Sequence, residues 1–188
     1  MTSDSISLDH SAAIEGLIER SFAVFKPPER LTVSEWAVRH RRLSPEGSAF
    51  TGRFRLEAAP YQQEPMEAVN DTDVQSVVLM WASQTGKTEV INNVVGFFIC
   101  EEPSPMLVLQ PTLDMAETWS KDRLAPMVRD TAVLTDLVAD PKARDSGNTV
   151  LHKRFTGGHV TVAGANSPAS LASRPIRVVL CDEVDRYP

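Results

Sequence analysis

Cysteine is scarce in this sequence, which holds only Cys100 and Cys181 among its 188 residues. The two lie far apart, without the close spacing of a zinc site, and they are too few for the disulfide framework of a small secreted domain. Each ends an apolar run, so we expect two buried free thiols with a structural role.

Long hydrophobic runs and a basic leader are also missing. The longest apolar stretches, Val94 to Cys100 and Val178 to Cys181, are far shorter than the roughly 20 residues that cross a bilayer. The amino-terminal MTSDSISLDHSAAIEGLIER has no basic segment followed by an apolar core, so it predicts neither a secretory signal nor a transit peptide. We therefore expect a soluble, cytoplasmic protein with no membrane partner.

Positive charge is in deficit, because the formal net charge is -6. That balance argues against a protein that coats nucleic acid, since phosphate neutralisation supplies most non-specific affinity, but it allows a motor that holds DNA transiently. The basic residues are nevertheless clustered, and each cluster is either a solvated face or a nucleic-acid contact. The clusters are Arg39-His40-Arg41-Arg42 with Arg53 and Arg55, and Lys153-Arg154.

What is present is an ordinary globular composition, 42% hydrophobic and 23% charged, enough for one domain with a sizeable core. We divide the chain into three parts. Residues 1–30 form a separable segment with an amphipathic helix from Ala12 to Phe25, ended by Pro27-Pro28. Residues 31–59 form an extended lead-in with a short helix around Ser34 to Arg41, and residues 60–188 form the main domain.

Strand and helix patterns alternate in residues 60–188, which predicts an α/β fold with a parallel sheet flanked by helices and a β-hairpin insertion. The hairpin turns at Gly157-Gly158, where both glycines are expected to supply a positive φ. The expected helices are 61–70, 88–100 and 114–129, the last with Asp114 as N-cap, and the expected strands are 75–81, 106–110, 150–155, 159–163 and 176–181.

The stretch WASQTGKTEV, residues 81–90, contains part of a phosphate-binding loop. The full pattern is Gly, four residues, Gly-Lys, then Ser or Thr. Gly86-Lys87-Thr88 is intact, but Trp81 replaces the first glycine. The expected strand before the loop and helix after it would point loop amides at an anion, and the alternative is an ordinary surface loop.

A second motif supports the nucleotide site. The run VVLCDE, residues 178–183, is four apolar residues followed by Asp-Glu, the form of a Walker B strand with its catalytic glutamate. We expect Lys87 to pair the β- and γ-phosphates, and Thr88 and Asp182 to hold Mg²⁺. Glu183 would polarise the attacking water; the alternative is an acidic strand end whose pairing with GKT is coincidence.

Both motifs belong to a longer series of distinctive stretches that spans residues 31–188. They are LTVSEWAVRHRRLSPEGSAFTGRFR, APYQQEPMEAV, VVLMWASQTGKTE, LVLQPTLDMAE, KRFTGGHVTVAGANSPASLASRP and VVLCDEVDRYP. Together they resemble the ATPase region of the large subunit of tailed-phage terminases, in particular the GpA-type class.

The resemblance implies a P-loop NTPase fold of the RecA/ASCE-like kind, ATP and Mg²⁺ as cofactors, and a motor that moves double-stranded DNA into an empty capsid. Such terminases tolerate a loop of the form Ser-Gln-x-Gly-Lys-Thr, here Ser83-Gln84-Thr85-Gly86-Lys87-Thr88. The implied partners are a terminase small subunit, the portal and procapsid, and further copies of the chain, in the cytoplasm of a bacterial host.

The resemblance also places individual residues. Tyr61 and Gln62 occupy the position of the family's adenine-reading element, and Pro111-Thr112 end the second strand as in a helicase-like motif. Related terminases have a γ-phosphate-sensing arginine where this chain has Ser83. Arg174, or a neighbouring subunit, is then the candidate phosphate-sensing group, and a structural salt bridge is the alternative for Arg174.

In the resembled family a coupling motif, further strands and an endonuclease domain follow the position of Pro188. We therefore expect this chain to be a fragment that holds the ATPase part, whether a cloned domain, a partial gene or a decayed prophage relic. Two alternatives stay open: a helicase-like ATPase of another lineage, and a catalytically inactive fragment that acts as an interaction module through the helix at residues 12–25.

Overall fold

The computed structural model describes residues 14, 16–18, 21–22, 30–48, 50–138, 147–166 and 175–188. The chain divides into two compact units, residues 1–30 and 31–188. In the first unit the described residues before Arg30 are helical, and their apolar side chains, Ile14, Leu17, Ile18 and Phe22, are about half exposed or more. The rest of the helix expected over residues 12–25 lies outside the described residues.

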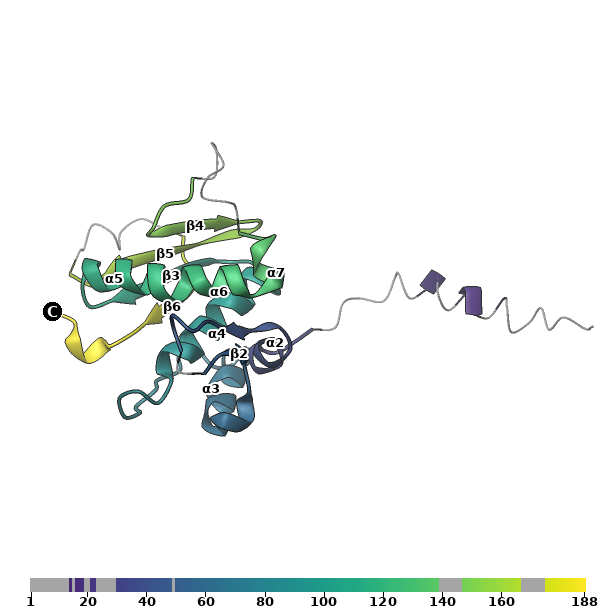
Figure 1. Ribbon diagram of the computed structural model, residues 1–188, viewed down its shortest axis with the longest axis horizontal. Coiled ribbons are helices and arrows are strands. Elements are labelled where there is room, and N and C mark those ends of the chain that lie inside the picture. Colours follow the sequence, from purple (N-terminus) through teal and green to yellow (C-terminus); the bar gives the residue numbers. More distant parts are fainter. Residues whose placement is uncertain are drawn as a thin grey trace, which may run out of the picture. The chain divides into compact units, whose positions relative to one another are not determined.

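A four-stranded mixed sheet forms the centre of the second unit, with strand order β4-β5-β3-β6 (Figure 1). Its strands are β3 (Pro105–Gln110), β4 (His152–Phe155), β5 (Gly158–Gly164) and β6 (Val178–Cys181). Strand β3 pairs in parallel with both β5 and β6, and β4 pairs antiparallel with β5. The expected α/β architecture with a hairpin is confirmed, and the hairpin is an integral part of the sheet.

The turn of this hairpin needs one left-handed residue. Gly157 has φ +87°, whereas Gly158 is not among the glycines with positive φ. The expectation of two such glycines was therefore wrong for Gly158. An added Cβ at Gly158 would lie 2.6 Å from the Ser104 carbonyl oxygen, so this glycine allows a close approach of backbone instead.

The strand expected over residues 75–81 is absent, because these described residues form no regular element. Val78 and Met80 are 77% and 92% exposed, while Leu79 and Trp81 pack against the core. A strand needs a hydrogen-bonded neighbour. Among the described strands, β6 pairs only with β3, and nothing pairs with the run at 75–81.

Helix α4 (Lys87–Cys100) is buried from Val90 to Ile99, and its two asparagines, Asn92 and Asn93, are buried together with the apolar residues. It packs against α2 (Val33–His40), which begins with a capping box formed by Thr32 and Glu35. Gly96 makes this packing close: an added Cβ would lie 2.1 Å from the Trp36 ring. The lead-in segment is thereby fastened to the helix that follows the GKT motif.

The single helix expected over residues 114–129 is interrupted. It consists of α5 (Leu113–Trp119), a π-helical turn η3 (Ser120–Leu124) and α6 (Ala125–Asp130). Pro126 has no N–H and its ring would clash with the carbonyl of residue 122 in a regular helix, which explains the wider turn. The N-cap is Thr112, whose hydroxyl accepts from the Met115 amide, and not Asp114 as expected.

Shorter elements complete the described chain. Helix α5 packs on β3 and β5, and α7 (Ala132–Thr135) contacts both α4 and α6. The remaining elements are a two-stranded antiparallel sheet of β1 (Arg42–Leu43) and β2 (Gly52–Arg53), and the helices η1 (Leu56–Ala58), η2 (Pro60–Gln62), α3 (Gln63–Ala68) and η4 (Val184–Arg186).

Both cysteines are free, but their burial differs from the expectation. Cys100 is half-buried at the end of α4, and Cys181 is exposed. Cys181 ends β6, an edge strand whose residues alternate between half-buried and exposed, which is why the apolar run did not bury it. Across the residues described above, no helix has both the length and the hydrophobicity required to span a bilayer.

Candidate nucleotide site

The loop at residues 82–86 leads directly into α4, with Gly86 as the N-cap of the helix. Gly86 has φ +86°, a conformation that side chains rarely adopt, and an added Cβ would lie 2.3 Å from the Gln62 Nε2. Both facts require glycine here. The Glu89 amide donates to the Gly86 carbonyl oxygen at 3.1 Å. The first amides of a helix have no carbonyl partner one turn earlier, so they can bind an anion.

Tyr61 and Gln62 hold this loop by its backbone. The Tyr61 hydroxyl donates to the Thr85 carbonyl oxygen at 3.0 Å, and the Gln62 Nε2 donates to the Gly86 carbonyl oxygen at 3.3 Å. The rings of Tyr61 and Trp81 also pack in a T-shaped arrangement, with centroids 5.1 Å apart and an interplanar angle of 89°. Trp81, in place of the first glycine, thus packs beside the loop.

Lys87 lies back across the loop that precedes it. Its Nζ donates to the carbonyl oxygens of Trp81 at 3.0 Å and Ala82 at 2.9 Å. Thr85 also donates from its hydroxyl to Ala82, at 2.7 Å. These bonds fold the loop into a compact turn around the ammonium group. An ammonium has three N–H donors, and two of them bind the described loop carbonyls.

Thr88 and Asp182 meet although they are 94 positions apart: the Thr88 hydroxyl donates to the Asp182 Oδ2 at 3.3 Å. Asp182 is only 6% exposed. Gln110, at the end of β3, donates from Nε2 to the same carboxylate oxygen at 3.3 Å. The parallel strands β3 and β6 bring their carboxyl ends together at this point.

Glu183 follows in a left-handed conformation, with φ 53°. Its Oε2 lies 3.0 Å from the Arg186 Nε, within the turn that includes η4. The hydroxyl of Tyr187 donates to the Leu109 carbonyl oxygen at 3.0 Å and fastens this turn to β3. Burial is the main cause that raises the pKa of Tyr187 above its ordinary value, and the neighbouring Cys181 adds to it.

The family model for the ATPase domain of the phage terminase large subunit gpA matches residues 48–188. The chain belongs to this family. Searches of curated proteins and of solved structures gave no match. The resemblance drawn from the motifs is thereby confirmed over residues 48–188.

The structure brings most of the expected terminase residues to one place. The loop, its lysine and Thr88 lie together with Tyr61, Gln62 and Asp182 through the bonds given above. Ser83 and Gln84 are exposed at the tip of the loop, and Gln84 has φ 59°. Arg174 lies outside the described residues, and the individual roles of the site residues stay predictions.

Several residues around the candidate site were not expected from the sequence. Gln110, Arg186 and Tyr187 each bind a motif residue or its neighbouring backbone. The sequence contained one indication of Gln110, because it is a polar residue at the end of the apolar run MLVL. The contacts of Arg186 and Tyr187 depend on the left-handed turn at Glu183, which no local pattern predicts.

The first basic cluster is not one surface. Arg41 is 4% exposed and paired with Glu89, so neither a solvated face nor a nucleic-acid contact describes it. Arg39, Arg42, Arg53 and Arg55 are exposed, as is Arg154. For those residues both alternatives remain open.

Proposed function

We propose that this chain binds ATP with Mg²⁺ at the loop before α4 and hydrolyses it, through a P-loop NTPase fold of the RecA/ASCE-like kind. The contact that carries the proposal is the one between Thr88 and Asp182, at 3.3 Å. It joins the GKT motif to the end of the apolar strand β6, as the pairing of a phosphate loop with a Walker B aspartate requires. A chance GKT on a surface loop would have no reason to meet that carboxylate.

The phosphate groups are assigned to the loop and the first turn of α4. Residues Ser83 to Gly86 supply backbone amides, and Lys87 would exchange its two carbonyl contacts for the β- and γ-phosphates. Tyr61 and Gln62 hold the loop, and the exposed Tyr61 ring can also contact the base. Arg174 stays a candidate phosphate-sensing residue.

The residues present fit Mg²⁺, which prefers oxygen ligands and keeps several of its waters. Thr88 and Asp182 offer a hydroxyl and a carboxylate side by side, and Gln110 fixes the carboxylate. In the described chain no group of three or more His, Cys, Asp or Glu could hold a metal alone, so the nucleotide would complete the site. When bound, the ion would neutralise charge on the phosphates.

Glu183 is the proposed group that orients and polarises the attacking water. Its carboxylate lies beside Arg186, and its backbone is held by the turn that Tyr187 anchors. Arg186 therefore limits the directions in which this carboxylate can point. Asp182 and Glu183, adjacent in sequence, would thus divide metal binding and water activation between them.

The process is proposed from the family. As part of a terminase large subunit, the site would drive double-stranded DNA into a procapsid in the host cytoplasm, with a small subunit, the portal and further copies of the chain as partners. In that setting an endonuclease function belongs to another part of the large subunit. Membership of the terminase family favours this lineage over a helicase-like ATPase of another kind.

Titration of the 188-residue chain with a fluorescent ATP analogue in Mg²⁺ tests the proposal. We expect saturable binding by the wild type. Lys87→Ala should lower the affinity about a hundredfold, because the lysine ammonium is the main positive charge that would contact the phosphates. Glu183→Gln should retain binding and lower turnover by roughly a hundredfold or more, as loss of a general base does.

Lys121→Ala is the matched control, since Lys121 pairs with Glu117 on the exposed surface of the chain. It should bind as the wild type does. A folded wild-type chain that does not bind ATP, or a Lys87→Ala variant that binds unchanged, would contradict the nucleotide site. Persistence of turnover in Glu183→Gln would contradict the assignment of that residue alone.

A further inference from the structure

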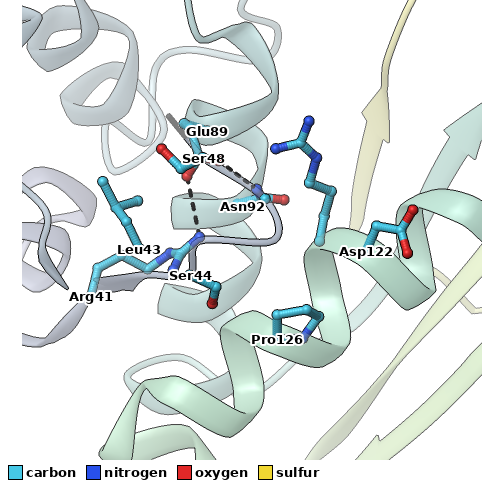
Figure 2. Close-up of a pocket in the computed structure, with 10 residues that line it drawn as sticks. Arg41, Leu43, Ser44, Ser48, Glu89, Asn92, Asp122 and Pro126 are labelled. Atoms are coloured by element: carbon cyan, nitrogen blue, oxygen red, sulfur yellow. Dashed lines mark hydrogen bonds and ion pairs between the residues drawn. The ribbon is translucent and has the colours of Figure 1, made fainter. Parts of the chain in front are cut away.

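Arg41 is a buried charge beside the candidate nucleotide site. It follows α2, is 4% exposed, and lies before the residues that the family model matches. Its Nη2 donates to the Glu89 Oε2 at 3.2 Å, and its Nη1 donates to the Arg42 carbonyl oxygen. No described group accepts from its Nε. Figure 2 shows the guanidinium directed at Glu89, on the facing side of α4.

Glu89 occupies a sensitive position, directly after Thr88 in the first turn of α4. Its backbone amide donates to the Gly86 carbonyl oxygen at 3.1 Å, so it is part of the turn that presents the phosphate-binding amides. Its side chain is 18% exposed, and its Oε1 accepts from the Asn92 Nδ2 at 3.3 Å (Figure 2). An unpaired carboxylate here would repel the phosphates of a nucleotide.

Burial strengthens this effect, because a half-buried charge is screened less by solvent than an exposed one. The other charged residues around the small pocket that Arg41 and Glu89 line are Asp122 and Arg123, which oppose one another in sign. Burial lowers the pKa of Arg41, and the carboxylates of Glu89 and Asp130 oppose that shift. Arginine side chains are charged in proteins, and Arg41 is the charged group in direct contact with Glu89.

We propose that Arg41 is a positioning residue that acts through Glu89: it fixes this carboxylate and cancels its charge at the phosphate-binding end of α4. The inference rests on the proposed ATP site and deepens it. Through Arg41, the lead-in segment would affect nucleotide binding electrostatically without contacting the phosphates. Arg41 does not contact the nucleotide, since it is enclosed by the protein.

The test uses four variants of the full chain, with ATP and ADP affinity measured by calorimetry and folding checked by thermal unfolding. Arg41→Met leaves Glu89 unpaired and should weaken ATP binding about three- to tenfold, and ADP binding less, because the repulsion grows with ligand charge. Glu89→Gln leaves Arg41 uncompensated and should tighten ATP binding about two- to fivefold. Arg41→Met with Glu89→Gln should return to the wild-type affinity.

Arg41→Lys is the matched control, because it keeps the charge and loses the planar fork of donors. It should bind ATP like the wild type even if its unfolding temperature falls. If Arg41→Met does not fold, the ATP affinity of Glu89→Gln tests the proposal by itself. This variant should fold, because the amide of the new glutamine can accept from Arg41 and donate to the Asn92 Oδ1, which lacks a described partner.

Opposite changes in affinity for Arg41→Met and Glu89→Gln would support the proposal. Equal losses in both variants, or an unchanged affinity in folded Glu89→Gln, would overturn it and leave the ion pair a structural contact. A wild-type chain that binds no ATP would instead overturn the proposed nucleotide site, and this inference with it.

Discussion

A methyl group at position 86 would meet two obstacles. The residue has φ +86°, and the added carbon would lie 2.3 Å from the Gln62 Nε2. Gln62 holds the loop through the Gly86 carbonyl oxygen, so displacing it would loosen the loop as well. Gly86→Ala should therefore weaken ATP binding about tenfold or more, by backbone strain and the loss of this contact.

Gly52 offers a matched control for that substitution. It has φ +97°, with open space around a would-be Cβ, and lies in β2. Gly52→Ala should cost stability by the same backbone strain while its ATP affinity stays at the wild-type value. Equal losses of affinity in the two variants, measured by the same titration, would show that general destabilisation is responsible.

Asp182 illustrates how much of a motif depends on neighbours that the motif does not contain. The carboxylate is buried, and a buried carboxylate is stable only with hydrogen-bond partners. Thr88 and Gln110 supply them from α4 and β3. The acidic residue of the strand therefore has its orientation set by two other elements of the fold.

The end of α6 ties the segment after β1 to the rest of the unit. Asp130 accepts from the Ser44 hydroxyl at 2.5 Å and lies 2.7 Å from the Arg129 Nε. Arg129 also reaches Glu46, with an Nη2 to Oε2 distance of 2.9 Å. The Arg129 and Ser44 hydrogen bonds lower the pKa of Asp130 from 3.8 to about 2.

This shift predicts a pH-dependent contribution to stability. Because the folded pKa lies below the unfolded one, the contribution is fully present above about pH 4 and is lost as the pH falls through about 2. Asp130→Asn should reduce the free energy of unfolding by about 1 kcal/mol at pH 7, after allowance for partial exposure. The difference from the wild type should shrink steadily between pH 4 and pH 2.

Urea unfolding at a series of pH values would measure that difference. Asp73→Asn, at an exposed residue of a turn, controls for the loss of one carboxylate. A constant difference between the wild type and Asp130→Asn across the acid range would contradict the assignment of the pKa shift to folded-state contacts.

The sheet of the second unit has an open edge at strand β6 among the described strands. Strand β6 pairs on one side only among the described strands, and Val179 on it is 55% exposed. The apolar run at 75–81 adds the exposed side chains of Val78 and Met80. An open strand edge and exposed apolar residues together favour association between copies.

We expect the 188-residue chain to associate with rising concentration through this region. The double variant Val78→Lys, Met80→Glu should raise the concentration of half-association by roughly tenfold, because it places charges where apolar side chains would be buried. Light scattering after size-exclusion chromatography would measure it. Phe50→Lys, at a residue that is 72% exposed, is the control, and an equal effect there would exclude a specific role of the edge.

The helices and strands that the sequence predicts well are those with a strong local pattern. Strands β3, β5 and β6 and helix α4 appear within a few residues of the expected bounds. The GKT and Asp-Glu motifs are equally local features, and together with the other distinctive stretches of residues 31–188 they indicate the family. Hydrophobic periodicity and short motifs are properties of neighbouring residues, so they can be recognised from the sequence alone.

The errors arose where distant parts of the chain compete or cooperate. The apolar run at 75–81 has strand-like residues but no hydrogen-bonding neighbour, and Cys181 ends an apolar run on an edge that leaves it exposed. Arg41 belongs to a basic cluster by sequence and to a buried ion pair by structure. In each case burial depends on which element packs alongside, and the local composition does not indicate which element that is.

Local sequence therefore specified the family, the main strands, the loop glycine and the residue types of the candidate site. Packing of elements far apart in the chain specified the approach of Thr88 to Asp182, the grip of Tyr61 and Gln62 on the loop, and the pairing of Arg41 with Glu89. The physical reason is that a motif supplies chemical groups, whereas distances, burial and charge compensation between them arise only when the whole unit closes around a common core.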